Sequence, residues 1–192
     1  MTEVADRFVV VLDANVLYPF RIRDVLLRFA EAGLFRARWS EQILNEWSAS
    51  LLTTKPHLEA SIRSQCDAMA HAFPEAMIEG HDALIPALDL PDPDDRHVLA
   101  AAIRAGAQHI VTANLKDFPA EALAPYGVEA VSPDAFLAAT YELYPRQATA
   151  TLRRMRRAYH KPPMSANELL LDLMRVGLPQ LAALVRQEIE ML

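Results

Sequence analysis

Residues 9–20 read VVVLDANVLYPF, in which four apolar residues run directly into an aspartate. The run from Phe8 to Asp13 is short, apolar and β-branched, which is typical of a buried strand. Similar short runs follow at residues 109–112 and in the segment VEAV, and helical patterns lie between them. Because strands that alternate with helices form parallel sheets, the sequence predicts an α/β fold with a central parallel sheet and helices on both faces.

The helical patterns are clearest in RDVLLRFAEAGL, EQILNEWSASLL and RHVLAAAIRAG, where apolar residues recur at helical spacing. After about Tyr141 the strand patterns stop and three more helices are expected. One of them is opened by a capping box of Ser165 and Glu168. We therefore predict a first domain over residues 1–142 and a helical C-terminal extension over residues 143–192.

The chain of 192 residues carries a net charge of -6, one cysteine and no apolar run near the roughly 20 residues that cross a membrane. A single thiol forms no internal disulfide, which fits a reducing cytosol and predicts a cytoplasmic protein. The lack of a long apolar run predicts that no segment crosses a membrane. The N-terminus MTEVADRF has acids and no apolar signal core, so it is not expected to be a secretory leader. The acidic charge argues against a protein that coats nucleic acid, but not against an enzyme that cuts it at an acidic metal site.

Acidic side chains recur where a parallel sheet gathers its functional groups, near the carboxyl ends of the strands. Asp13 ends the first expected strand. The other candidates are Glu46 in the segment EQILNEW, Asp92, Asp94 and Asp95 in PDPDDRH, and Asn114 and Asp117 in TANLKDF. Acids beside a helix N-terminus are also stabilised by the helix dipole, which is an alternative role for one or two of them.

The sequence contains no cluster of His or Cys with zinc-like spacing, so a metal site built from these candidates consists of oxygen ligands. Carboxylate-rich oxygen sites favour Mg²⁺ or Mn²⁺. These ions activate water and stabilise a phosphate under attack, which is the chemistry of phosphodiester cleavage. His97 and His109 are interpreted as ordinary polar or core residues.

Four segments together resemble the PIN-domain nucleases, in particular the VapC-type toxins of bacterial toxin–antitoxin pairs. They are VVVLDANVLYPF, SEQILNEW, PDPDDRHVLAAAIRAGA and IVTANLKDFP, and they occur in the family's order over about residues 8–119. The resemblance implies a three-layer α/β/α sandwich with a central parallel sheet and RNA cleavage that depends on Mg²⁺ or Mn²⁺. It also implies frequent homodimers and a small cognate antitoxin as the partner.

The resemblance further assigns roles to individual residues. Asp13, Glu46 and Asp95 correspond to the family's metal-binding acids, and Asp117 corresponds to its more variable fourth acid. The remaining residues have supporting roles: Asn15 braces Asp13, Asp92 and Asp94 lie outside the direct ligands, and Asn114 stands where some members carry an acid. Separately, the place of Thr112 at a strand end predicts that it contacts a ligand.

A basic segment lies near the C-terminus, where residues 146–161 carry several cations and no acid. One interpretation is a track for RNA phosphates. The other is a helix whose cations are solvated or pair with acids such as Asp172. The residues predicted to bind RNA are Arg153, Arg154, Arg156 and Arg157.

The sequence thus predicts a Mg²⁺- or Mn²⁺-dependent endoribonuclease, a hydrolase that acts as the toxin of a toxin–antitoxin pair. One alternative is a haloacid-dehalogenase-like phosphatase with Asp13 as nucleophile, but such an enzyme would have a second aspartate at the position of Asn15. Another alternative is a non-catalytic binding domain that keeps the fold, against which the intact set of acids argues.

Overall fold

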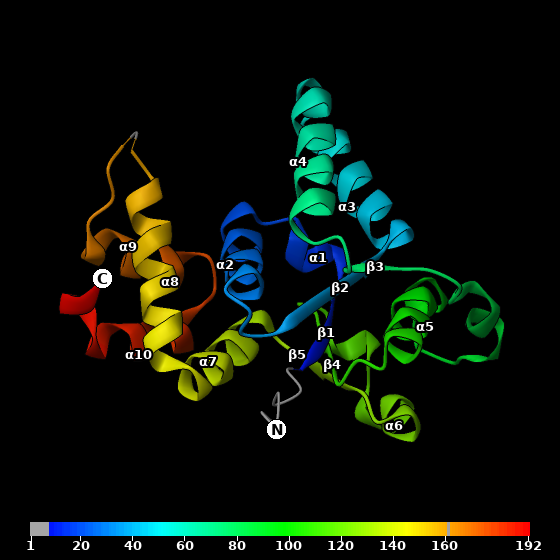
Figure 1. The fold of residues 1–192 in the computed structure, drawn as a ribbon. Helices are drawn as coiled ribbons and strands as arrows, with labels where there is room; N and C mark the ends of the chain where they lie inside the picture. Colours follow the sequence, from blue (N-terminus) through cyan, green and yellow to red (C-terminus); the bar gives the residue numbers. More distant parts are fainter. Residues whose placement is uncertain (1–7, 161) are drawn as a thin grey trace, which may run out of the picture. The chain divides into compact units, whose positions relative to one another are not determined.

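A five-stranded parallel sheet forms around the strand that residues 9–20 predict (Figure 1). The computed structural model describes residues 8–160 and 162–192. The strands are β1 (Val9–Leu12), β2 (Arg36–Ser40), β3 (Met77–Ile78), β4 (His109–Val111) and β5 (Glu129–Val131). Every neighbouring pair of these strands is parallel. The predicted α/β class with a central parallel sheet is therefore confirmed.

The strand order is β3-β2-β1-β4-β5, so the chain builds outward from β1 in both directions. In such sheets ligands bind outside the carboxyl ends of the strands where the strand order reverses. Here that point lies between β1 and β4, which are followed by Asp13 and Thr112. The backbone N–H of Asp13 donates to the carbonyl of Val111 at 3.1 Å, which holds these two strand ends together.

Five helices accompany the sheet: α1 (Ala14–Leu17), α3 (Glu41–Thr54), α4 (Glu59–Ala72), α5 (Arg96–Ala105) and α6 (Ala120–Leu123). Helix α5 packs on β1, β2 and β4 through the fully buried Ala100, Ala101 and Ala102. It ends at Gly106, whose φ of 61° lies in the left-handed region that favours glycine at a helix end. The segment before α5 contains the short 3-10 turns Asp82–Ala87 and Pro93–Asp95.

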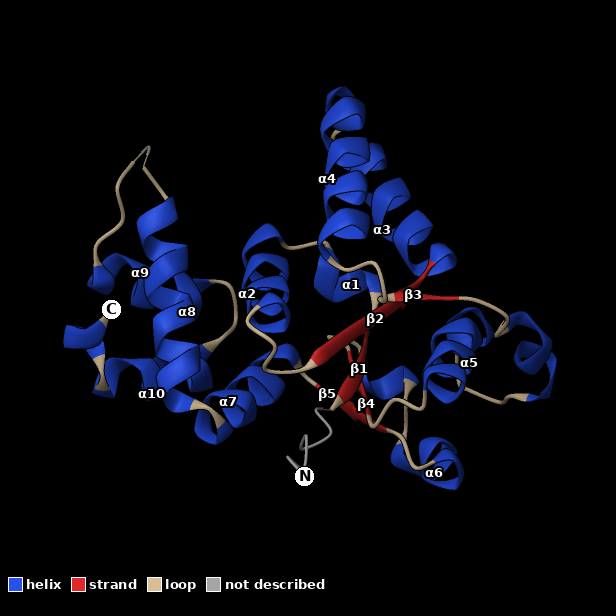
Figure 2. Cartoon of the chain, viewed as in Figure 1, coloured by secondary structure: helices blue, strands red, loops and turns tan. Residues whose placement is uncertain are grey.

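The structure divides the chain into two compact units. The first unit comprises residues 8–18 and 35–131 of the described chain and contains all five strands (Figure 2). The second unit comprises residues 19–34 and 132–192, apart from residue 161, and is helical. Its helices are α2 (Phe20–Glu31), α7 (Pro133–Leu143), α8 (Pro145–Ala158), α9 (Ala166–Arg175) and α10 (Pro179–Gln187).

The second unit differs in extent from the extension that the sequence predicts over residues 143–192. It begins at Ser132 and also includes residues 19–34. The physical reason is that the apolar face of α2 packs against α8, more than a hundred residues away in the sequence. The predicted capping box is present at the start of α9, where Ser165 and Glu168 each accept the other's backbone N–H.

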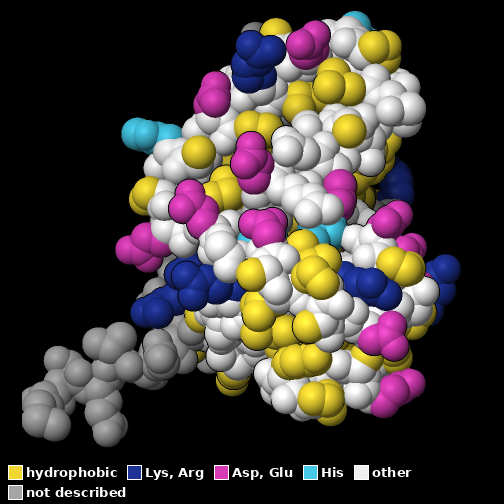
Figure 3. All heavy atoms as spheres, turned by 90° about the vertical axis from the view of Figure 1, so that its right-hand side faces the viewer, with side chains coloured by type: hydrophobic (Ala, Val, Ile, Leu, Met, Phe, Trp, Pro, Cys, Tyr) yellow, Lys and Arg dark blue, Asp and Glu magenta, His cyan; other side chains and the backbone are white. Residues whose placement is uncertain are grey.

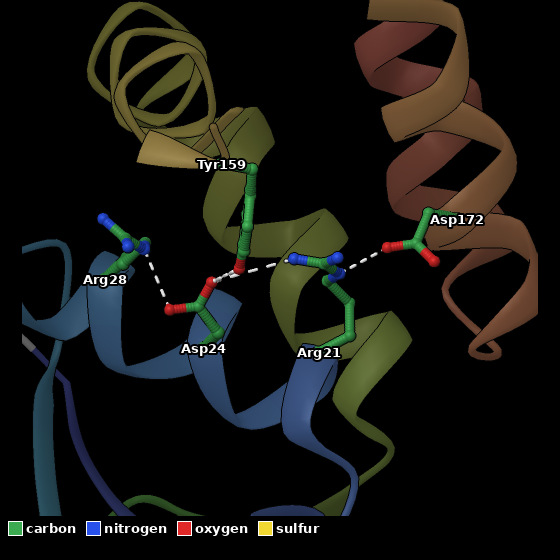
Figure 4. Close-up of polar contacts among 5 residues, drawn as sticks. All are labelled: Arg21, Asp24, Arg28, Tyr159 and Asp172. Atoms are coloured by element: carbon green, nitrogen blue, oxygen red, sulfur yellow. Dashed lines mark hydrogen bonds and ion pairs between the residues drawn. The ribbon is translucent and has the colours of Figure 1, made fainter. Parts of the chain in front are cut away.

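Polar contacts fasten α2 to the chain after α8 and to α9 (Figure 4). Asp24 accepts hydrogen bonds from Nε of Arg28 at 2.9 Å and from the hydroxyl of Tyr159. Arg21 pairs with Asp172, and its guanidinium lies 4.4 Å from the ring centroid of Tyr159. Burial, followed by the contact with Asp24, raises the pKa of Tyr159 well above its usual value, so the phenol stays neutral and donates.

Replacing Tyr159 with phenylalanine is expected to destabilise the second unit by about 1 kcal/mol, because one hydrogen bond to Asp24 is lost while Arg28 still pairs with it. The measurement is amide hydrogen exchange in α2, which follows this unit separately. Tyr126→Phe is the matched control, since Tyr126 is 43 % exposed in the first unit. Equal protection of α2 in the wild type and in Tyr159→Phe would contradict the prediction.

Candidate metal centre

Asp13 ends β1, begins α1 and is only 4 % exposed. Its Oδ1 accepts the backbone N–H of Ala14 at 2.6 Å, so the residue is also the N-cap of α1. Its Oδ2 accepts from Nδ2 of Asn15 at 2.6 Å and from the hydroxyl of Thr112 at 2.7 Å. Burial raises the pKa of Asp13, while the hydrogen bonds from Thr112 and Ala14 oppose the rise. Because a carboxylate oxygen has two lone pairs, Oδ1 keeps one for a further ligand.

Asn15 and Thr112 connect the ends of β1 and β4. The side-chain oxygen of Asn15 accepts the backbone N–H of Ala113 at 2.9 Å, while its Nδ2 donates to Asp13. Thr112 is fully buried, and its hydroxyl accepts the backbone N–H of Asn114 at 3.0 Å. These contacts fix the carboxylate of Asp13 at the switch point of the sheet. Direct contact of Thr112 with a ligand stays a prediction.

Three further carboxylates lie close together in the segments before α5 and after β4. Asp92, Asp95 and Asp117 each present an oxygen, and these atoms all lie within 4.8 Å of one another. Asp92 also caps the turn at residues 93–95 by accepting the N–H of Asp94 at 2.9 Å. Asp117 accepts a hydrogen bond from the side-chain amide of Asn114.

The carboxylate of Asp95 interacts electrostatically with Asp13 as well as with Asp92 and Asp117. Burial, and then the charges of Asp13, Asp92 and Asp117, raise the pKa of Asp95 to about 6. So many like charges repel one another unless a cation lies between them. An all-oxygen donor set of this kind fits a divalent cation such as Mg²⁺, Mn²⁺ or Ca²⁺.

Glu46 projects from the middle of α3, and its side chain is 42 % exposed. Its Oε1 lies 2.8 Å from Nε2 of the buried His97 and accepts a longer hydrogen bond, 3.3 Å, from Gln42. The charge of Glu46 also contributes to the raised pKa of Asp13, so the two carboxylates interact electrostatically. We call the five residues Asp13, Glu46, Asp92, Asp95 and Asp117 the acid centre.

An open cleft of about 400 Å³ adjoins the acid centre. It is lined by Gln42, Glu46, Ile85, Pro93, Asp94, Asp95 and His97. Figure 3 shows the face of the first unit on the α5 side, where Asp and Glu side chains gather with histidine among them. A flexible polyanion such as RNA would meet negative charge here, so binding its phosphate requires a cation.

The arrangement differs in two details from the ligand set that the resemblance implies. Asp92, assigned a place outside the direct ligands, has an oxygen within 4.8 Å of oxygens of both Asp95 and Asp117. Glu46 is not part of that close group and instead faces His97, a residue that the sequence interpretation treated as ordinary. The segment Asp-Arg-His places His97 two residues after Asp95, and this spacing was the available signal. The metal-binding roles stay predictions.

The arginines of α8 fall into two groups. Arg156 donates to main-chain oxygens of Met164 at 2.7 Å and Leu192 at 3.0 Å, and Arg153 donates to that of Met191. Arg154 and Arg157 are exposed, although Arg154 also contacts Thr151 at 3.0 Å. The first pair therefore holds the C-terminal segment in place. A role of any of the four in RNA binding stays a prediction, and the exposed pair is better placed for it.

In residues 8–160 and 162–192, no helix has both the length and the apolar character needed to cross a membrane.

Comparison with known families identifies the class that this fold and acid centre define. The family model of the PIN domain matches residues 9–116, and that of the VapC50 C-terminal domain matches residues 133–187. The chain belongs to the PIN-domain family. The range matched by the PIN domain lies in the first unit except for residues 19–34, which belong to the second unit. The range matched by the VapC50 C-terminal domain lies in the second unit.

Among curated proteins, the chain is similar to "Putative ribonuclease VapC50" of Mycobacterium tuberculosis (strain ATCC 25618 / H37Rv). The two are 38 % identical over 135 residues, which are 70 % of this chain and 79 % of that protein. No solved structure gives a significant match.

Proposed function

We propose that this protein is a divalent-metal-dependent endoribonuclease and the toxin of a toxin–antitoxin pair. The observation that carries the proposal is the acid centre beside the switch point of a PIN-domain sheet, where Asp92, Asp95 and Asp117 lie close together and interact electrostatically with Asp13. The similarity to a mycobacterial protein named as a ribonuclease supports the same activity. Neither the phosphatase nor the non-catalytic alternative is favoured by these relationships.

The residues proposed to hold Mg²⁺ or Mn²⁺ are Asp13, Glu46, Asp95 and Asp117, with Asp92 now added to them. A cation held there supplies activation of a water molecule and neutralisation of the phosphate's charge. Asn15 and Thr112 keep Asp13 oriented, and Asn114 does the same for Asp117. In-line attack of water on the phosphodiester leaves a 5′-phosphate and a 3′-hydroxyl.

The proposed partners follow from the family and from the surface charge. RNA is the substrate, and Arg154 and Arg157 are proposed to contact its phosphates because their side chains are exposed and carry the positive charge that the acid centre lacks. A small antitoxin and a second copy of this chain are further proposed partners.

The metal requirement is tested with labelled RNA and purified protein in Mn²⁺, in Mg²⁺ and in excess EDTA. Cleavage is expected with either ion and is expected to stop in EDTA. Asp13→Asn should lower the cleavage rate by about 10²-fold or more, since metal activation contributes several kcal/mol. Asp67→Asn, an exposed acid on α4, is the matched control and should cleave normally. Cleavage that persists in EDTA and in Asp13→Asn would refute the mechanism.

A further inference from the structure

His97 is a buried imidazole beside the acid centre, and the function proposed above gives it no task. It is 2 % exposed and lies in the first turn of α5, the helix that packs on the central strands of the sheet. Its Nε2 lies 2.8 Å from Oε1 of Glu46, although the two atoms are not aligned for a linear hydrogen bond. Among the described residues, neither ring nitrogen has another hydrogen-bond partner. The 2.8 Å approach to Glu46 is therefore the ion-pair contact that the described structure gives this imidazole, which also interacts electrostatically with Asp13 and Asp95.

Glu46 is held by fewer and longer hydrogen bonds than Asp13 is. Asp13 is held by donors from Ala14, Asn15 and Thr112, as short as 2.6 Å. Glu46 has a longer side chain with more rotatable bonds and is 42 % exposed, and Gln42 donates a 3.3 Å hydrogen bond to it. Ordering such a side chain costs conformational entropy unless a rigid partner holds it.

We propose that His97 is a positioning residue that directs the carboxylate of Glu46 toward the other acids of the acid centre. Oε1 of Glu46 faces His97, and its Oε2 remains available for a cation. The inference rests on the proposed function, since Glu46 matters here as a metal ligand. Partners that orient metal ligands commonly change metal affinity by about 10- to 100-fold when they are removed.

The contact itself is tested in the metal-free protein, independently of any nuclease activity. Glu46→Gln is expected to shift the imidazole ¹⁵N and ring ¹H resonances of His97 and to leave those of His81 unchanged. His81 is the matched control because it is 5 % exposed and likewise has no hydrogen-bond partner for its ring nitrogens in the described chain. Unchanged His97 resonances in Glu46→Gln would overturn the inference.

The positioning role is tested by the Mn²⁺ affinity of His97 variants, measured by calorimetry. His97→Leu, which removes the polar ring at similar volume, should weaken Mn²⁺ binding about tenfold or more. His97→Gln, which restores an amide donor, should recover most of that loss, and His81→Leu should bind as the wild type. Thermal unfolding shows whether each variant is folded.

The possible results separate this inference from the proposed function. If the wild type binds Mn²⁺ and cleaves RNA but His97→Leu binds Mn²⁺ equally well, only the role of His97 falls. A His97→Gln variant as weak as His97→Leu would also reject positioning by a donor. If the wild type binds no Mn²⁺, both the proposed function and this inference are rejected.

Discussion

Asp95→Asn is expected to abolish RNA cleavage and, in the absence of metal, to make the protein more stable. The loss of cleavage follows from the position of Asp95, whose oxygen lies within 4.8 Å of those of both Asp92 and Asp117. An amide cannot replace the negative charge that attracts a divalent cation. Since metal activation contributes several kcal/mol, the cleavage rate should fall by about 10²- to 10³-fold or more.

The gain in stability follows from the pKa of Asp95, which the folded protein raises from 3.8 to about 6. A raised carboxyl pKa means that the folded state binds the proton more tightly than the unfolded state does. The stability of the metal-free protein therefore falls as pH rises from about 4 to about 6, and the full penalty is present above that window. With allowance for solvent screening, the penalty is about 1 kcal/mol at neutral pH, and Asp95→Asn removes it.

Thermal unfolding in EDTA at pH 7.5 and at pH 4 provides the measurement. The variant should unfold at a higher temperature than the wild type at the higher pH, and the difference should shrink at the lower pH. Added Mn²⁺ should stabilise the wild type, because a cation that binds only the folded protein raises its stability. It should not stabilise the variant, which is expected to lose the binding site. Asp67→Asn controls for the loss of any exposed acid. A less stable Asp95→Asn in EDTA would contradict the electrostatic argument.

The toxin role is tested by bacterial growth on expression of the wild type and of Asp95→Asn. Expression of the wild type should arrest bacterial growth, and expression of Asp95→Asn at the same level should not. Because this variant is expected to be at least as stable as the metal-free wild type, loss of toxicity would not reflect misfolding. Arrest by both proteins would reject RNA cleavage as the cause of toxicity.

The largest effect on stability is expected in the second unit, at Asp134. Asp134 lies in the first turn of α7 and is 7 % exposed. Its two oxygens accept the backbone N–H groups of Gln180 and Leu181, each at 3.0 Å, at the start of α10. The N-cap position of α10 is Leu178, which provides no side-chain cap. Asp134 thus caps α10 from another helix, where a negative charge also meets the positive end of the helix dipole.

Asp134→Ala should destabilise the second unit by about 2–3 kcal/mol, because two backbone donors lose a charged partner. Asp134→Asn, which keeps one acceptor oxygen, should cost less. Both tryptophans, Trp39 and Trp47, lie in the first unit, so their fluorescence does not follow this loss. Amide hydrogen exchange in α10 is the suitable measurement. Glu142→Ala, an exposed acid on the same helix, is the control and should leave exchange unchanged.

Much of this fold could be predicted because the patterns that determine it are local. The apolar runs at β1 and β4 predict strands, and the capping box at Ser165 predicts where α9 begins. The two-residue strand β3 could not be predicted, since two residues carry no periodicity. It forms because the N–H of Trp39 on β2 donates to the carbonyl of Ala76 beside it.

The sequence by itself determined the class of fold and the candidate acids, since both depend on residue type and short-range order. The tertiary structure decided which acids meet: it brought Asp92 to Asp95 and Asp117 and turned Glu46 toward His97. It also decided that α2 joins the C-terminal helices and that Asp134 caps α10. These features depend on contacts between residues distant in the chain, whose partners are selected by packing and charge after the local elements have formed.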